Sequence, residues 1–183
     1  VQGAATHQQA VFLGSHDVSR LATTVASPAA RRALMAALFS LPGQPLLYYG
    51  EELDLVDSAF ATGQDYAWRA PMPWSTAPNA GFTVATDAWM PPDPGFAAGQ
   101  NVEDESRDER WVHQLAELRL TSPALSKGST RYLPSAPGVL SVERIWEAEV
   151  IRVEINFSSA PAPGLDGELP AFEYDQVRSR LDE

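Results

Sequence analysis

Three polar side chains follow an apolar run near the start of the chain. The segment VFLGSHDVSRL places His16, Asp17 and Arg20 shortly after the apolar residues 11–13. A fixed carboxylate stabilises positive charge on a bound molecule, and a guanidinium donates paired hydrogen bonds to hydroxyl or carboxylate groups. These residue types at this spacing therefore suit a site that faces a ligand.

A second apolar run ends in the same way. Residues 44–49, QPLLYY, are followed by Gly50, Glu51 and Glu52. Both runs are apolar without alternation, which is typical of strands in a parallel sheet covered on each face. Polar groups at the carboxyl ends of neighbouring parallel strands gather at one edge, where α/β folds form their active sites. We therefore expect the two acidic endings to lie close together.

A helix is predicted between these two strands. Ser27 suits the N-cap, Pro28 suits the first turn and Gly43 lies just past the expected end. A strand, a helix and a second strand within this length form a βαβ unit. One apolar face of the helix is predicted from the spacing of Leu34, Met35, Leu38, Phe39 and Leu41.

Structural interpretations of the same residues stay open. An Asp after a strand often serves only as a helix cap or turn residue, and a histidine such as His16 is often a satisfied structural residue. Two features favour a ligand site. Ser27 already caps the following helix, and the second strand repeats the acidic ending.

A long segment without periodicity, residues 51–105, follows the second strand. Loops beyond about 15 residues in compact domains are usually functional or disordered, and the aromatic content here favours an ordered lid or pocket wall. Most of these rings are expected to bury the loop on itself, and one or two to contact a ligand. They are Trp68, Trp74, Phe82, Trp89 and Phe96.

The composition excludes several classes of protein and partner. The net charge of -11 over 183 residues argues against nucleic acid or an anionic membrane as a partner. There is no cysteine, so thiol catalysis and disulfides are excluded. Neither a spanning segment nor a signal peptide is visible, so we expect no membrane association. A cytoplasmic location is expected, with secretion left open because the native N-terminus is expected to be missing.

The C-terminal part of the chain has a different sequence pattern. A capping box of Ser106 and Glu109 predicts a second helix, with Arg119 on its solvated side. Short strand-like runs follow at residues 138–145 and 150–157, and the second alternates as strands of an antiparallel sheet do. A small β domain is therefore expected after the α/β part.

Several motifs in this order resemble one family. The segments are FLGSHDVSRL, LPGQPLLYYGEEL, RAPMPW followed by PNAGF, WMPPDP and SPAL. Together they resemble the C-terminal portion of the alpha-amylase family of glycoside hydrolases, most closely its alpha-glucosidase and oligo-1,6-glucosidase branch. The combination is specific, although each piece alone is modest.

The resemblance implies a fold and a domain organisation. It predicts an α/β chain holding the last strands and helices of a TIM barrel, followed by a small all-β domain of the β-sandwich type. Residues 1–128 would be the C-terminal part of the catalytic barrel, with the long loop 51–105, and residues 129–183 the β-sandwich.

The resemblance also implies roles for single residues. Asp17 matches the carboxylate that stabilises the transition state, and His16 matches a histidine on the same sugar. Arg69 matches an arginine that holds the terminal glucose, and Arg20 is a further candidate for substrate binding. Structural supports of the pocket are predicted at Glu51, Glu52 and Tyr48.

Departures from the family pattern limit what this chain can do alone. Ser15 stands where Asn is common, and Gln64-Asp65 where Arg-Asp is common. The nucleophilic Asp and the acid Glu of the family would lie upstream of Val1. We therefore expect part of a retaining hydrolase, inactive alone, that acts on an α-linked oligosaccharide or disaccharide with an N-terminal barrel half in the same polypeptide or a partner chain.

Other functions stay open at this point. One is a non-catalytic chain that binds sugar or protein, one is half of a split enzyme, and one is a trehalose synthase or transglycosylase of the same family. No cofactor is expected, and no metal, because the chain holds no dense carboxylate loop of the EF-hand type.

Overall fold

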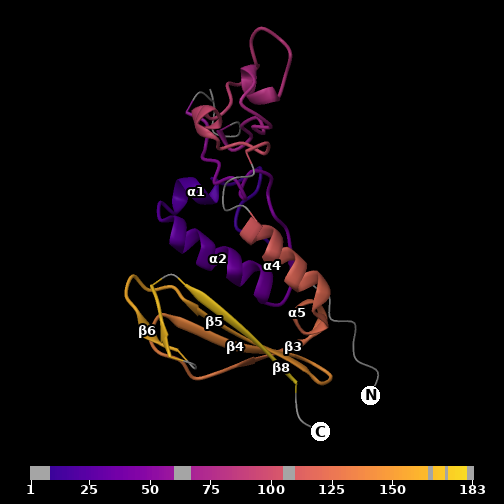
Figure 1. The fold of residues 1–183 in the computed structure, drawn as a ribbon, viewed down its shortest axis with the longest axis vertical. Helices are drawn as coiled ribbons and strands as arrows, with labels where there is room; N and C mark the ends of the chain where they lie inside the picture. The colour runs from indigo at the N-terminus through magenta and orange to yellow at the C-terminus, as the bar shows by residue number, and fades with distance from the viewer. Residues whose placement is uncertain (1–8, 60–66, 105–109, 165–166, 172, 181–183) are drawn as a thin grey trace. The chain divides into compact units, whose positions relative to one another are not determined.

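The computed structural model describes residues 9–59, 67–104, 110–164, 167–171 and 173–180. The chain divides into two compact units (Figure 1). Unit 1 comprises residues 1–11, 29–46 and 115–183, and unit 2 comprises residues 12–28 and 47–114. Each unit is described by itself below. Among the described residues, no helix combines the length and the apolar character that crossing a bilayer needs.

A short parallel strand pair opens unit 1. Strand β1 (Ala10–Val11) pairs with β2 (Gln44–Pro45) in parallel. The predicted pairing and direction of the strands are confirmed, but strands of the predicted length are wrong, because each spans only two residues. The apolar residues just after them are not covered: Phe12 is 52% exposed and Leu46 is 49% exposed.

The helix between these strands, α2 (Pro28–Ser40), confirms the sequence prediction. Its first residue is Pro28, which places Ser27 at the N-cap position. Met35, Leu38 and Phe39 are buried as expected. After the helix, Gly43 has φ +123°, a conformation that glycine adopts without strain.

A second long helix and a short one precede the sheet. Helix α4 (Arg110–Thr121) lies where a helix was predicted, while its capping box of Ser106 and Glu109 lies outside the described residues. Arg119 is buried, and its guanidinium donates to the carbonyls of Phe39, Leu41 and Gly43. The prediction of a solvated Arg119 is therefore wrong. Helix α5 (Pro123–Lys127) is capped by the Ser122 hydroxyl, which accepts from Leu125 N.

Unit 1 ends in a four-stranded antiparallel sheet with the order β3-β4-β5-β8, drawn in orange and yellow in Figure 1. Strands β4 (Val139–Trp146) and β5 (Glu149–Asn156) confirm the two predicted strands. Strand β3 (Ser129–Tyr132) pairs with β4, and β8 (Tyr174–Arg180) pairs with β5. A two-stranded pair, β6 (Ala162–Pro163) with β7 (Glu168–Leu169), adds Ala162 and Leu169 to a small core with Val139.

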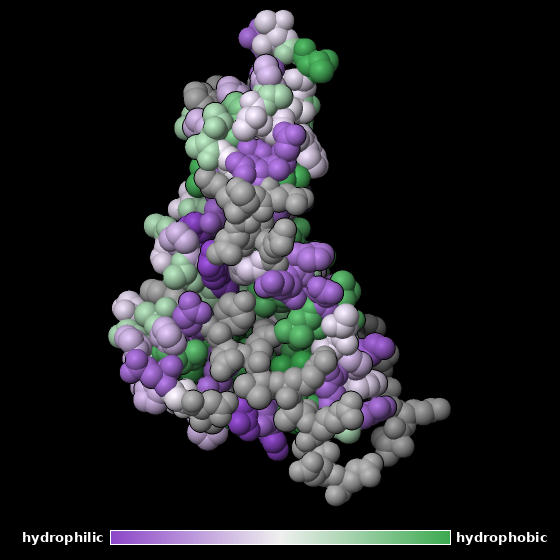
Figure 2. All heavy atoms as spheres, in the orientation of Figure 1, coloured by the Kyte–Doolittle hydropathy of each residue, from purple (hydrophilic) through white to green (hydrophobic). Residues whose placement is uncertain are grey.

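Unit 2 consists almost entirely of loop, as predicted. Apart from the first residues of α4, which reach into unit 2, the regular elements in its described residues are short. They are α1 (Leu21–Thr24) and the 3-10 turns η1 (Pro78–Gly81) and η2 (Pro94–Ala98). The expectation that most of its five aromatic rings are buried is wrong for Trp74, Phe82 and Trp89, which are more than half exposed. Figure 2 shows hydrophobic side chains reaching the surface beside polar ones.

Candidate functional site

The candidate site lies in unit 2, where a tight turn presents His16 and Asp17. Ser15 and Val18 form an isolated antiparallel bridge, and the Asp17 N–H donates to the Ser15 hydroxyl at 3.1 Å. The serine at the departure from the family pattern therefore stabilises the turn. The turn leaves the carboxylate of Asp17 accessible, because 68% of its side chain is exposed.

Both carboxylate oxygens of Asp17 have a partner. His16 Nε2 lies 3.3 Å from Oδ2, and Arg69 Nη2 lies 3.4 Å from Oδ1. Arg69 also donates from Nε to the His16 carbonyl at 3.1 Å. Three residues that the sequence placed in one site are thus brought together. Their side chains stay open to a ligand, with exposures of 64% for His16 and 40% for Arg69.

Arg20 is fully buried. Its Nη1 donates to the Tyr49 carbonyl at 2.8 Å, and its guanidinium lies 4.7 Å from the centres of both the Tyr48 and the Tyr49 rings. Its backbone N–H donates to Asp57 Oδ1 at 2.8 Å. This position beneath two rings argues against the direct substrate contact expected of Arg20.

Polar atoms around Arg20 are buried without a hydrogen-bond partner in the described part of the chain. They are Nε and Nη2 of Arg20, Oε1 of Glu51 and Oε2 of Glu52. Such atoms are costly unless the charges of neighbouring groups offset the loss of water. The Arg20 charge does act on both carboxyl groups, but burial outweighs it and raises the pKa of each, that of Glu51 to about 7.

A hydrogen bond joins Glu51 and Tyr48 in the segment after β2, and the support of the pocket that the resemblance implies for them stays a prediction. Glu51 Oε2 accepts from the Tyr48 N–H at 3.1 Å. Gly14 approaches the other oxygen so closely that a Cβ there would lie 2.5 Å from Oε1. Burial raises the pKa of the Tyr48 hydroxyl to about 12, so it remains a hydrogen-bond donor at all moderate pH values.

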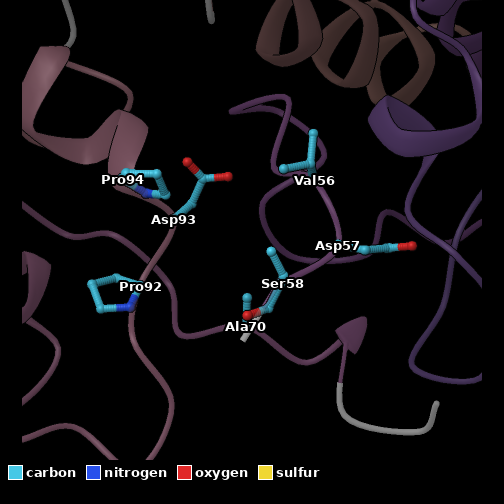
Figure 3. A pocket seen from close by; sticks show the side chains of 8 residues that line it. Val56, Asp57, Ser58, Ala70, Pro92, Asp93 and Pro94 are labelled. Carbon is cyan, nitrogen blue, oxygen red and sulfur yellow. The ribbon is translucent and has the colours of Figure 1, made fainter. Parts of the chain in front are cut away.

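A cavity of about 270 Å³ also lies within unit 2. One wall comes from Pro92, Asp93 and Pro94 of the WMPPDP segment, and another from residues 56–58 and Ala70 (Figure 3). The Asp57 carboxylate points away from the proline wall in this view, consistent with its bond to the Arg20 N–H. The RAPMPW segment, through Ala70, and the WMPPDP segment thus line one cavity.

No group of His, Cys, Asp and Glu in the described residues has an arrangement that could hold a metal ion. The Gln64-Asp65 departure lies outside the described residues. The sequence did not single out Tyr49, whose neighbours in the QPLLYY run look like ordinary strand residues. Its hydroxyl donates to the Ala70 carbonyl at 2.7 Å.

The sequence matches a known family over most of its length. The model of the alpha-amylase catalytic domain matches residues 2–128. Trehalose synthase/amylase TreS of Mycolicibacterium smegmatis is 34% identical over 119 residues, 60% of this chain and 20% of that protein. An alpha-glucosidase of Culex pipiens is 34% identical over 97 residues, 51% of this chain and 16% of that protein.

A different kind of relative matches equally well. The amino acid transporter heavy chain SLC3A1 of Rattus norvegicus is 36% identical over 127 residues, 64% of this chain and 18% of that protein. Among solved structures, the alpha-glucosyl transfer enzyme XgtA matches with a TM-score of 0.77 and 29% identity, over 93% of this chain and 40% of that chain. The chain thus spans about a fifth of the length of these curated relatives.

Proposed function

The chain belongs to the alpha-amylase catalytic-domain family, and from this premise we propose that it is the C-terminal part of a retaining hydrolase of the alpha-glucosidase type. Its substrate is an α-linked oligosaccharide or disaccharide. Residues 1–128 then form the last part of the barrel, and residues 129–183 form a small domain of the β-sandwich type. The exposed pairing of Asp17 with Arg69 carries this proposal.

Asp17 stabilises the transition state in this proposal. Glycosidic bond cleavage builds positive charge on the sugar ring, and a fixed carboxylate in a closed pocket offsets it far better than water does. His16 and Arg69 hold the two oxygens of that carboxylate in place. The remaining donors of Arg69 are available to hydroxyl groups of the terminal glucose.

The catalytic pair itself lies outside this chain in the proposal. A retaining mechanism needs a nucleophile and an acid about 5 to 5.5 Å apart, and the family supplies both from earlier barrel strands. The exposed apolar residues beside β1 and β2, Phe12 and Leu46, fit a barrel that further strands complete. The chain alone is therefore expected to be inactive.

Substitution of Asp17 by Asn in the polypeptide that joins this chain to its N-terminal barrel half tests the proposal. Loss of the charge is expected to lower kcat by about 10²- to 10³-fold, the typical effect of removing one stabilising group. The matched control is Asp87→Asn, an exposed loop carboxylate, which should leave kcat unchanged. An Asp17→Asn enzyme with the control's kcat would contradict the assigned role.

Transglycosylation is a second candidate activity, because TreS and XgtA are named for trehalose synthesis and glucosyl transfer. Product analysis with a disaccharide separates it from hydrolysis. Free glucose indicates hydrolysis, and a rearranged or longer sugar indicates transfer.

A non-catalytic subunit is the third candidate, favoured by the match to a transporter heavy chain. In that case the joined polypeptide binds a partner protein and hydrolyses no α-glucoside. Turnover that Asp17→Asn abolishes would exclude this candidate.

A further inference from the structure

The hydroxyls of two consecutive tyrosines form hydrogen bonds with the backbone on either side of Arg69. The Tyr48 hydroxyl donates to the Trp68 carbonyl at 3.1 Å, and the Tyr49 hydroxyl donates to the Ala70 carbonyl at 2.7 Å. The residue between these two carbonyls is the one whose guanidinium reaches Asp17. Fixing both carbonyls limits how far the backbone of Arg69 can rotate.

The two tyrosine rings contact each other and the buried guanidinium of Arg20. They pack edge to face, with their centres 4.7 Å apart, and the buried Arg20 guanidinium lies 4.7 Å from each. The attraction between a cation and an aromatic face is stronger when both are shielded from water, as the buried Arg20 guanidinium is. The bond from Arg20 Nη1 to the Tyr49 carbonyl adds a second anchor to the same residue.

These contacts therefore form a closed ring of interactions around the candidate site. Arg20, three residues beyond Asp17, holds Tyr49, and Tyr49 holds the carbonyl next to Arg69. Arg69 then returns to the His16 carbonyl and to Asp17. Arg69 is 40% exposed, so packing restrains it only in part, and the two tyrosine hydroxyls add a restraint on the backbone beside it.

We propose that Tyr49, assisted by Tyr48, is a positioning residue that sets Arg69 against Asp17 for the recognition of a terminal sugar. Tyr49 touches no substrate in this role and acts through the Ala70 carbonyl. The link from Tyr49 to Arg69 stands on the contacts alone, while its use in sugar recognition rests on the proposed function.

The link from Tyr49 to Arg69 can be tested without an activity assay. The measurement is the exchange of the Arg69 Nε proton with water, followed by NMR on the whole chain. Tyr49→Phe keeps the ring over Arg20 and removes only the hydroxyl. Loss of one hydrogen bond, about 1 kcal/mol, corresponds to roughly fivefold faster exchange. Tyr48→Phe should act in the same direction, and Tyr132→Phe on the exposed strand β3 is the matched control. Exchange in Tyr49→Phe that equals the control would overturn the proposal, even if the variant were less stable.

The role of Arg69 in sugar recognition is tested by the kinetics of the polypeptide that joins this chain to its N-terminal barrel half. Tyr49→Phe should raise KM roughly fivefold, because Arg69 contacts the terminal sugar in the ground state as well as in the transition state. It should lower kcat only slightly, because Asp17 keeps its contact with His16. A purely structural tyrosine would instead lower the active fraction and so kcat. Faster Arg69 exchange with an unchanged KM would confirm the positioning link and contradict the sugar-binding role of Arg69.

Discussion

Glu143 in unit 1 and Glu51 in unit 2 have nearly the same small solvent exposure but lie in opposite electrostatic settings. Glu143 on β4 is 4% exposed and Glu51 is 5% exposed. Arg152 and Arg131 bind the two oxygens of Glu143, which lowers the pKa of that carboxyl. Glu51 has one backbone donor, and burial raises its pKa to about 7. Glu143 therefore has a charged partner at each oxygen, whereas Glu51 Oε1 has no hydrogen-bond partner among the described residues, although the sheet too holds unpartnered buried atoms such as Nε of Arg144 and of Arg152.

The apolar residues show the same contrast. In the sheet, Val142, Val153 and Ile155 are completely buried. Beside β1 and β2, Phe12 and Leu46 are half exposed. The sheet thus has a closed apolar core, whereas the apolar residues beside β1 and β2 remain open to water.

Alanine substitutions give the largest expected difference between the two regions. Ile155→Ala should lower the free energy of unfolding by about 2–5 kcal/mol, because it opens a cavity in a closed core. Phe12→Ala should cost less than about 1 kcal/mol, since the ring already contacts water. Urea denaturation measures both, and equal losses would remove the contrast.

Glu51→Gln should give a smaller effect of opposite sign. A raised pKa means that the folded chain binds more protons than the unfolded one between pH 4.5 and about 7, so stability falls as pH rises through this range and stays low above it. Removing the charge should therefore stabilise the chain by about 2–3 kcal/mol at pH 8 and flatten the slope. Thermal unfolding at several pH values reveals this, and a Gln variant with the same slope would show that Glu51 is not its source.

Glu143→Gln is expected to have the smallest effect. Its lowered pKa contributes stability that is present above pH 4.5 and is lost as pH falls through the folded pKa. The side chains of Arg131 and Arg152 are 62% and 39% exposed, so water weakens the pair and the loss should be about 1 kcal/mol at pH 7. The free energies of unfolding of Glu51→Gln and Glu143→Gln, measured over a range of pH, should move away from that of the parent in opposite directions as the pH rises. Parallel curves would contradict the comparison.

Sequence patterns predicted the regular elements better than the loops between them. Periodicity located α2, β4 and β5 because each buries a face at the spacing of its own backbone. It overestimated β1 and β2, whose length depends on ladder partners that lie elsewhere in a sheet. It missed β8, since the residues from Tyr174 onward carry no clear alternation.

The candidate site was predicted in outline only. Motif order placed His16, Asp17 and Arg69 together, and the structure brings them together. Arg119 looked like a surface residue, yet it donates to carbonyls about eighty positions earlier. The hydrogen bond from Tyr49 to the Ala70 carbonyl could not be predicted either, because a backbone carbonyl acceptor has no sequence signature.

Hydrolysis of a chromogenic α-glucoside, by the chain alone and by the chain joined to its N-terminal barrel half, tests the central claim most directly. Our account predicts no turnover by the chain alone and turnover by the joined polypeptide that depends on Asp17. Full activity of residues 1–183 alone would contradict it, because the nucleophile and the acid would then lie within this chain.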